Sequence, residues 1–321
     1  MGIVGQAEQE EFNLVSYAEH WLHRRKDSGQ FSGQTIRNNK QHVRRLREYA
    51  EQDKRFATEF DDITFRWFDG FVEWLYNQNL SQNTVSKTIA DFKQIMQAAF
   101  DDEVSMNGIH TSKRVNVKWA SSDKIHLNES ELKKIARTEI PTDTLKRARD
   151  TMLIACYTGQ RVSDWRKLNK ENVREVDGVQ YFTFRQKKGQ KKEVWIPISP
   201  FVRSLMDQYD WEMPMGSEQK FNVAIKEVCK LAGIDQEVSI LKHGKVKKVE
   251  RVPKYTQISS HTARRSFITN AIQAGVNKDL LMKVTGNTPK TIDTYNKTTS
   301  QQAAIILSED EFFRKNALRV V

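Results

Sequence analysis

The sequence predicts a mainly α-helical protein with a small β component, in which an N-terminal four-helix domain precedes a C-terminal α+β domain. Four amphipathic segments follow one another between residues 12 and 104, each with apolar residues at helical spacing. Between residues 180 and 198 the pattern changes to the alternation typical of a β-hairpin, with helical segments on both sides. Charge divides the chain in a similar way, because the net positive charge lies in residues 126–321.

The chain has 321 residues and a formal net charge of +11. Residues 1–125 carry 17 basic against 18 acidic side chains, a net of −1, whereas residues 126–321 carry 35 against 23, a net of +12. A basic half of this kind favours a polyanionic partner such as nucleic acid.

Composition also indicates where the protein works. The sequence contains no run of eighteen apolar residues, and its first eleven residues lack the basic and apolar regions of a secretory signal. Cys156 and Cys229 lie in apolar helical patterns and are expected to be small buried hydrophobes, neither a disulfide nor a metal pair. We therefore expect a cytoplasmic protein, associated with the nucleoid if its polyanionic partner is DNA.

The N-terminal domain is expected over residues 12–104, after a disordered lead at 1–11. Its first helix starts at Phe12 and its second covers residues 35–52. A third helix covers residues 64–76, and its predicted inward residues are Phe65, Phe68, Phe71, Val72 and Leu75. The fourth starts at the capping residue Ser81 and is expected to stop at Asn107-Gly108. Residues 105–125 then read as a linker.

The second domain is expected over residues 126–300. A strongly apolar helix covers about residues 145–157 and stops at Gly159, and a polar helix follows from Ser163. Residues 180–185 and 193–198 form a hairpin, and a helix covers about 217–232 with Leu231 among its inward residues. Residues 235–256 form a second, basic hairpin. The tail, residues 301–321, has capping-box spacing and an apolar face, which predicts a helix.

Four polar features of this domain are not explained by the fold alone. Arg161 follows a helix-ending glycine, with Asp164 three residues later to orient its guanidinium. Lys187 and Lys188 precede Gly189 at the turn of the first hairpin. The last two features are the His261-x-x-Arg264 pair, whose members share one helical face, and Tyr295.

Together these residue types suit phosphoryl transfer. Two guanidiniums neutralise the charge that builds up on a phosphodiester, and they do so with fixed, forked donors. A phenol, whose pKa is ordinarily about 10, needs a base and a positive field before it can attack phosphorus. The leaving alkoxide needs an acid, which a lysine can supply. The sequence shows no cluster with metal-ligand spacing, so we expect neither a metal nor another cofactor.

These four features, in this order, resemble the tyrosine recombinase (phage-type integrase) family over residues 12–295. The resemblance includes a lysine-bearing hairpin that ends in Ile196-Pro197-Ile198 and the run Ser-Ser-His-Thr-Ala-Arg-Arg-Ser-Phe from Ser259 to Phe267. That run is especially similar to integrases of Bacteroidetes-like mobile elements. The resemblance implies a helical core-binding (SAM-like) domain and a catalytic domain that clamp DNA between them.

The resemblance also implies a role for each matching residue. Arg161 and Arg264 clamp the scissile phosphate, and His261 helps to deprotonate the nucleophile. Tyr295 is the nucleophile and forms a 3′-phosphotyrosine. Lys187 is chosen as the general acid, with Lys188 as its rival.

At Asn287 the sequence departs from the family, which usually has histidine, less often tryptophan, after the glycine that corresponds to Gly286. An asparagine can donate a hydrogen bond to a phosphate oxygen, but it cannot move a proton. The spacing from this position to the tyrosine is eight residues, where nine is commoner.

In the N-terminal domain the resemblance implies contacts to DNA from one face of the second helix and from the start of the fourth. The candidate DNA-binding residues are Arg37, Lys40, Arg44, Arg47, Thr84 and Lys87. Phosphate contacts from such residues predict strong salt dependence.

The partners implied are double-stranded DNA with a core recombination site, further copies of the chain and accessory DNA-bending or directionality proteins, without a membrane. We expect a homotetramer on DNA and a monomer or weak oligomer without it. The tail closes its own domain or docks on a neighbouring protomer. The family often has a further N-terminal arm-binding domain, and here only about eleven residues precede the first helix.

The resulting hypothesis is a metal-independent site-specific recombinase that integrates or excises a mobile element. A type IB topoisomerase-like relaxase would share the chemistry but would need no partner site. A catalytically impaired DNA-binding protein of the same fold is the alternative that Asn287 suggests.

Overall fold

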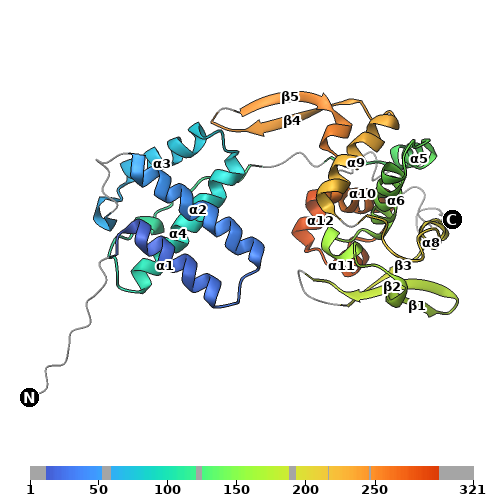
Figure 1. The fold of residues 1–321 in the computed structure, drawn as a ribbon, viewed down its shortest axis with the longest axis horizontal. Coiled ribbons are helices and arrows are strands. Elements are labelled where there is room, and N and C mark those ends of the chain that lie inside the picture. The colour runs from blue at the N-terminus through green and yellow to red at the C-terminus, as the bar shows by residue number, and fades with distance from the viewer. Residues whose placement is uncertain are drawn as a thin grey trace, which may run out of the picture. The chain divides into compact units, whose positions relative to one another are not determined.

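The fold is described by a computed structural model covering residues 12–52, 59–120, 125–187, 193–215, 217–245 and 247–295. The chain forms two compact units. The helical unit comprises residues up to 122 together with 240–250, and the mixed unit comprises 123–239 and 251–321 (Figure 1). Within the described ranges, no helix combines the length and the apolar character that a membrane crossing requires.

The helical unit contains the four predicted helices, three of them begun by a capping side chain. Asn13 caps α1, Thr64 caps α3 and Ser81 caps α4, each through its side-chain oxygen, as expected for residues that satisfy free amide groups at a helix start. The helices are α1 (Leu14–Asp27), α2 (Gly33–Gln52), α3 (Phe65–Asn77) and α4 (Gln82–Asp101), with the short 3₁₀ turns η1 (Phe60–Asp62) and η2 (Ile109–Thr111).

The core of this unit is built around aromatic rings. Trp67 and Phe92 stack with their centroids 5.7 Å apart, and Phe71 packs against both. The predicted inward role of Phe65 is wrong, since that side chain is 38% exposed, whereas Trp67 is 1% exposed. The cause is helical phase: residues 67, 68, 71 and 75 define the buried stripe, and Phe65 lies about 60° beyond its edge.

The fourth helix ends at Asp101, six residues before the predicted stop at Asn107. The segment after it packs back on the helical unit: Val115 is fully buried in its core, and Asn83 exchanges hydrogen bonds with the backbone of Ala120. Part of the expected linker, up to residue 120, therefore contributes to this core.

The mixed unit contains helices, a three-stranded sheet and a hairpin. Its helices are α5 (Glu129–Arg137), α6 (Asp143–Thr158), α7 (Val162–Trp165), α8 (Pro200–Asp207), α9 (Glu218–Leu231), α10 (Ser260–Gln273), α11 (Lys278–Thr285) and α12 (Pro289–Tyr295), with the 3₁₀ turns η3 (Lys170–Asn172) and η4 (Lys254–Gln257). Its strands are β1 (Val173–Val176), β2 (Val179–Arg185) and β3 (Glu193–Pro197), and β4 (Glu237–His243) and β5 (Lys247–Pro253) form the second predicted hairpin, whose tip groups with the helical unit.

The antiparallel sheet has the order β1-β2-β3, so β1 extends the predicted hairpin by one strand. Phe182 lies opposite Ile196 and Phe184 opposite Val194, which turns these apolar side chains toward the core. The sequence reasoning missed β1 and α8. Leu231 was expected inward but is 45% exposed, because it is the last residue of α9, beyond the stripe that ends at Val228.

The core of the mixed unit surrounds α6, which is buried along most of its length and packs against α9 and α10 (Figure 1). Cys156 and Cys229 are both buried free thiols, as predicted. A buried ion pair joins Lys254 Nζ to both carboxylate oxygens of Glu131, at 2.6 and 2.7 Å. This core holds the ends of α6, α10 and α11, where the candidate site lies.

Candidate active site

Arg264 is deeply enclosed in the site. It lies in the second turn of α10, and only 2% of its surface is exposed. Its Nη1 donates to the carbonyl of Gly159 at 3.1 Å, and its Nη2 donates to the carbonyl of Thr285 at 2.7 Å and to Asn287 Oδ1 at 2.5 Å. These acceptors are neutral, so they fix the guanidinium while leaving its positive charge in place.

Arg161 is placed by the end of α6. Gly159 ends that helix with φ of +67°, a conformation that favours glycine, and a Cβ there would lie 2.2 Å from the ring of Phe267. Two residues later Arg161 begins α7, half-buried. Its Nη1 lies 3.4 Å from Gln186 Oε1, and its Nη2 lies 3.5 Å from the carbonyl oxygen of Gly286.

Both arginines therefore reach the same turn, which follows α11. Gly286 ends α11 with φ of +63°, and this conformation presents the carbonyls of Thr285 and Gly286 to the two guanidiniums. Asn287 Oδ1 accepts from Arg264, whereas its buried Nδ2 has no hydrogen-bond partner among the residues that the structure describes. A buried amide donor without a partner is costly unless a ligand satisfies it.

His261 lies one turn before Arg264, on the exposed side of α10. The pKa of its imidazole is lowered, first by desolvation among its neighbours and then by the positive charges of Arg265, Arg264 and Arg161. The ring is open to solvent at one side, so the nearby charges are the more robust cause. A lowered pKa keeps the imidazole neutral near pH 7, in the form that can accept a proton.

Tyr295 is the last residue of α12 that the structure describes. The helix begins at Pro289, and Thr288 Oγ1 accepts from the backbone amide of Thr291. Ile292 anchors it, because that side chain is 1% exposed and packs with residues of α10 and α11. The side chain of Tyr295 lies outside what the structure describes.

Other tyrosines are committed to structural contacts. The Tyr157 hydroxyl donates to Glu129 at 3.0 Å and the Tyr209 hydroxyl donates to Asp150 at 2.7 Å. Burial, with the adjacent carboxylate second, raises the pKa of both phenols. A raised pKa opposes ionisation, so neither phenol suits a nucleophile.

The lysine hairpin is described up to Lys187, an exposed residue. Its backbone amide donates to Asp164 Oδ1 at 3.0 Å, so Asp164 fixes the start of the hairpin turn. The expected role of Asp164 in orienting Arg161 stays a prediction. Lys188, the rival acid, lies outside the described residues.

Sequence reasoning missed two buried glutamines, Gln160 and Gln186, whose side chains are 0% and 3% exposed. The sequence carried one usable signal. In β2 the inward positions are 182 and 184, so the alternation predicts an inward side chain at 186, where an amide replaces the expected apolar residue. A polar residue at a core position requires partners, which points to a network.

The six candidate DNA-binding residues all lie on α2 and α4, and five are exposed while Thr84 is partly buried. Two of them have carboxylate partners: Arg44 Nε lies 2.6 Å from Glu48, and Arg47 pairs with Glu19. Arg45, absent from the prediction, contacts Thr88 of α4 through Nη1 at 3.1 Å.

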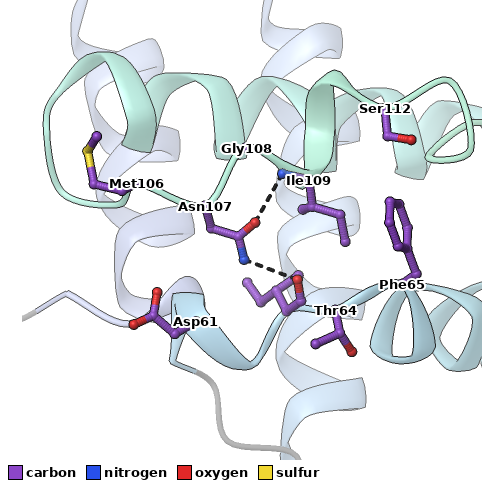
Figure 2. Close-up of a pocket in the computed structure, with 9 residues that line it drawn as sticks. Asp61, Thr64, Phe65, Met106, Asn107, Gly108, Ile109 and Ser112 are labelled. Carbon is purple, nitrogen blue, oxygen red and sulfur yellow. Dashed lines mark hydrogen bonds between the residues drawn. The ribbon is translucent and has the colours of Figure 1, made fainter.

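A hollow of about 610 Å³ lies elsewhere in the helical unit, between the start of α3 and the segment 106–112 (Figure 2). Asn107 bridges it, donating to the carbonyl of Ile63 and accepting from the amide of Ile109. None of its lining residues is a candidate site residue. Among the described residues, no group of histidine, cysteine and carboxylate side chains is placed to hold a metal ion.

Models of known protein families match both parts of the chain. The model of the phage integrase SAM-like domain matches residues 13–115, and that of the phage integrase family matches residues 126–302. No curated protein matches the sequence.

Solved structures share the fold at low identity. The Tn1549 transposon integrase in complex with circular intermediate DNA has a TM-score of 0.64 at 15% identity, covering 92% of this chain and 99% of that one. The XerH recombinase bound to palindromic difH substrate has a TM-score of 0.64 at 15% identity, covering 95% and 98%. A lambda integrase dimer bound to a COC′ core site has a TM-score of 0.61 at 14% identity, covering 88% and 97%. With family models matched over most of its length, the chain belongs to the phage integrase family of tyrosine recombinases.

Proposed function

We propose that this protein is a site-specific DNA recombinase that cleaves and rejoins DNA through a 3′-phosphotyrosine at Tyr295. The observation that carries the proposal is the meeting of Arg161 and Arg264 on one turn, residues 285–287. That turn leads directly into α12, whose last residue is Tyr295. Two guanidiniums held by neutral acceptors suit a phosphodiester, because its charge grows in the transition state.

In the proposed reaction the Tyr295 oxygen attacks the scissile phosphorus, and the phenolic proton passes to the neutral imidazole of His261. The bond from phosphorus to the 5′ oxygen breaks, and Lys187, or Lys188 in its place, protonates that oxygen. A 5′-hydroxyl from a partner strand then attacks the phosphotyrosine in the reverse sense, which restores Tyr295. No metal takes part.

Asn287 fits this scheme as a donor. Its Oδ1 accepts from Arg264, which directs the Nδ2 hydrogens away from that arginine. The buried, unpartnered Nδ2 would donate to a non-bridging phosphate oxygen. In this role the amide stabilises charge without moving a proton.

The wider proposal concerns DNA and assembly. Arg37, Lys40, Arg44, Arg47, Thr84 and Lys87 bind the DNA backbone from a core-binding domain over residues 12–104, and a catalytic domain covers residues 126–300. The relatives were solved on DNA, one as a lambda integrase tetramer bound to a Holliday junction. We propose a homotetramer on DNA, acting in the cytoplasm with accessory proteins to integrate or excise an element of the Bacteroidetes-like kind.

A nicked suicide substrate tests the chemistry. The DNA that flanks the gene is searched for inverted repeats around a spacer, which supply the substrate, and adducts are separated on a denaturing gel. We expect wild type to form a covalent adduct and Tyr295→Phe to form none. Tyr181→Phe is the matched control, because Tyr181 lies in β2 against Trp195. We expect this variant to form the adduct as fully as wild type.

Each alternative outcome identifies a different error. An adduct that survives Tyr295→Phe refutes the nucleophile. Binding by wild type without any adduct supports an impaired DNA-binding protein. Relaxation of supercoiled DNA that carries no recombination site, without multimer formation, supports a topoisomerase-like relaxase.

A further inference from the structure

Two glutamine amides lie buried beside the arginines and have no place in the reaction proposed above. Gln160 Nε2 donates to the carbonyls of Thr158 and Val284, both at 3.0 Å. Gln186 Nε2 donates to Gln160 Oε1 at 2.7 Å and to the carbonyl of Thr285 at 2.9 Å. Burying an amide is costly unless its groups are satisfied, and here the recorded bonds satisfy them.

Gln186 lies at the centre of this network because it faces Arg161 directly and shares an acceptor with Arg264. The Thr285 carbonyl that accepts from Gln186 also accepts from Arg264 Nη2 at 2.7 Å. The amide has a fixed polarity: with Nε2 used by two acceptors, Oε1 is the end that faces Arg161 Nη1 at 3.4 Å. A continuous path therefore runs from Arg161 through Gln186 and Thr285 to Arg264.

The adjacent turn is shaped to admit this amide. A Cβ at Gly286 would lie 2.0 Å from Gln186 Oε1, so any side chain there would displace the oxygen that faces Arg161. The carbonyl of Gly286 also accepts from Arg161, at 3.5 Å. Glycine at 286 and glutamine at 186 thus fit together around one guanidinium.

The chemistry of the amide is also specific. These two contacts of Arg161 are long, 3.4 and 3.5 Å, and both come from neutral oxygens, so they guide the guanidinium without neutralising its charge. A carboxylate of the same length would attract the guanidinium strongly and cancel the charge that a phosphate needs. An apolar side chain of the same length would leave Arg161 without this guide.

From these contacts we infer that Gln186 is a positioning residue, which holds the guanidinium of Arg161 in register with Arg264 through the turn at Thr285–Gly286. The inference rests on the proposed function for its effect on cleavage, and it adds a residue that touches no DNA. Because a misplacement of about 1 Å can cost on the order of 10²-fold in rate, the effect is measurable.

The experiment compares Gln186→Met, Gln186→Glu and the matched control Gln180→Met. Gln180 lies in β2, the strand that leads to Gln186, and its side-chain amide contacts only Glu175 among the described bonds. The first readout needs no activity: the ¹⁵N–¹H signal of Arg161 Nε in the full-length protein, assigned by its loss in Arg161→Lys. We expect it to shift or broaden in both Gln186 variants and to match wild type in Gln180→Met.

The second readout is the single-turnover cleavage rate of the suicide substrate. We expect roughly 10²-fold slower cleavage by Gln186→Met, with Gln186→Glu slower still. On a substrate with a methylphosphonate at the scissile position, the reacting phosphorus carries less charge and needs Arg161 less. On that substrate the ratio of the wild-type cleavage rate to the Gln186→Met cleavage rate should fall close to one. Loss of folding alone would not produce this change.

An unchanged Arg161 signal in a folded Gln186→Met protein overturns the inference, as does an equal slowing on both substrates. If wild type forms no adduct at all, the proposed function fails instead, and the Arg161 signal still decides whether Gln186 holds the guanidinium.

Discussion

Arginines have different surroundings in the two units of this molecule. In the helical unit, Arg44 and Arg47 lie at the surface, and each is matched with a carboxylate, Glu48 and Glu19. In the mixed unit, Arg264 is 2% exposed, and two backbone carbonyls and an amide oxygen are among its acceptors. The first arrangement compensates the charge, whereas the second orients it for a ligand.

The difference follows from desolvation. An exposed pair costs little to form and contributes about 0–1 kcal/mol, so such arginines can exchange a carboxylate for a DNA phosphate. A buried guanidinium needs a scaffold that satisfies its donors, and here the end of α6 and the turn after α11 both contribute to it. The surface arginines therefore need only helix faces, whereas the buried site needs the whole mixed unit.

The largest expected effect is on cleavage by Arg264→Ala. This change removes one of two charges beside the phosphate, so we expect the single-turnover rate to fall by about 10²–10³-fold. Arg44→Ala is the matched control in the helical unit and should change that rate at saturating DNA very little. Equal losses of cleavage rate in Arg264→Ala and Arg44→Ala would contradict the contrast between the two units.

The scaffold itself can be tested through Gly159→Ala. The new Cβ would enter a left-handed conformation and lie 2.2 Å from the Phe267 ring. We expect the free energy of unfolding in urea to fall by more than about 2 kcal/mol, with slower cleavage because the Gly159 carbonyl holds Arg264. Gly178→Ala is the control: its φ is +75° but the space around it is open, so it should lose only about 1 kcal/mol.

A smaller effect is expected in the pH profile. His261 must be neutral to accept the proton, and its pKa is lowered, so activity is lost only as pH falls through that lowered value. The acid limb of kcat/KM should lie below pH ~6.5, the ordinary value for histidine. Arg265→Gln removes one of the charges that lower the pKa, so it should move the limb to higher pH, by less than about one unit. A limb that Arg265→Gln leaves in place would exclude His261 as the titrating base.

The helices were predictable because their signals are local. Caps such as Ser81, Thr64 and Asn128 lie where the structure begins α4, α3 and α5. The errors arose where a pattern was short or weak: β1 has four residues and lies largely at the surface, and Phe65 lies at the edge of its helical stripe. Sequence periodicity fixes the axis of a stripe more reliably than its margins.

By itself the sequence determined the fold class and the candidate residues Arg161, Arg264 and Tyr295, because each is encoded over a few neighbouring residues. Only the tertiary structure decided which groups hold those arginines. Arg264 meets the carbonyl of Gly159 across 105 residues of sequence, and Gln186 meets Thr285 across 99. Such contacts depend on how α6, β2 and α11 pack, and no local spacing records that packing.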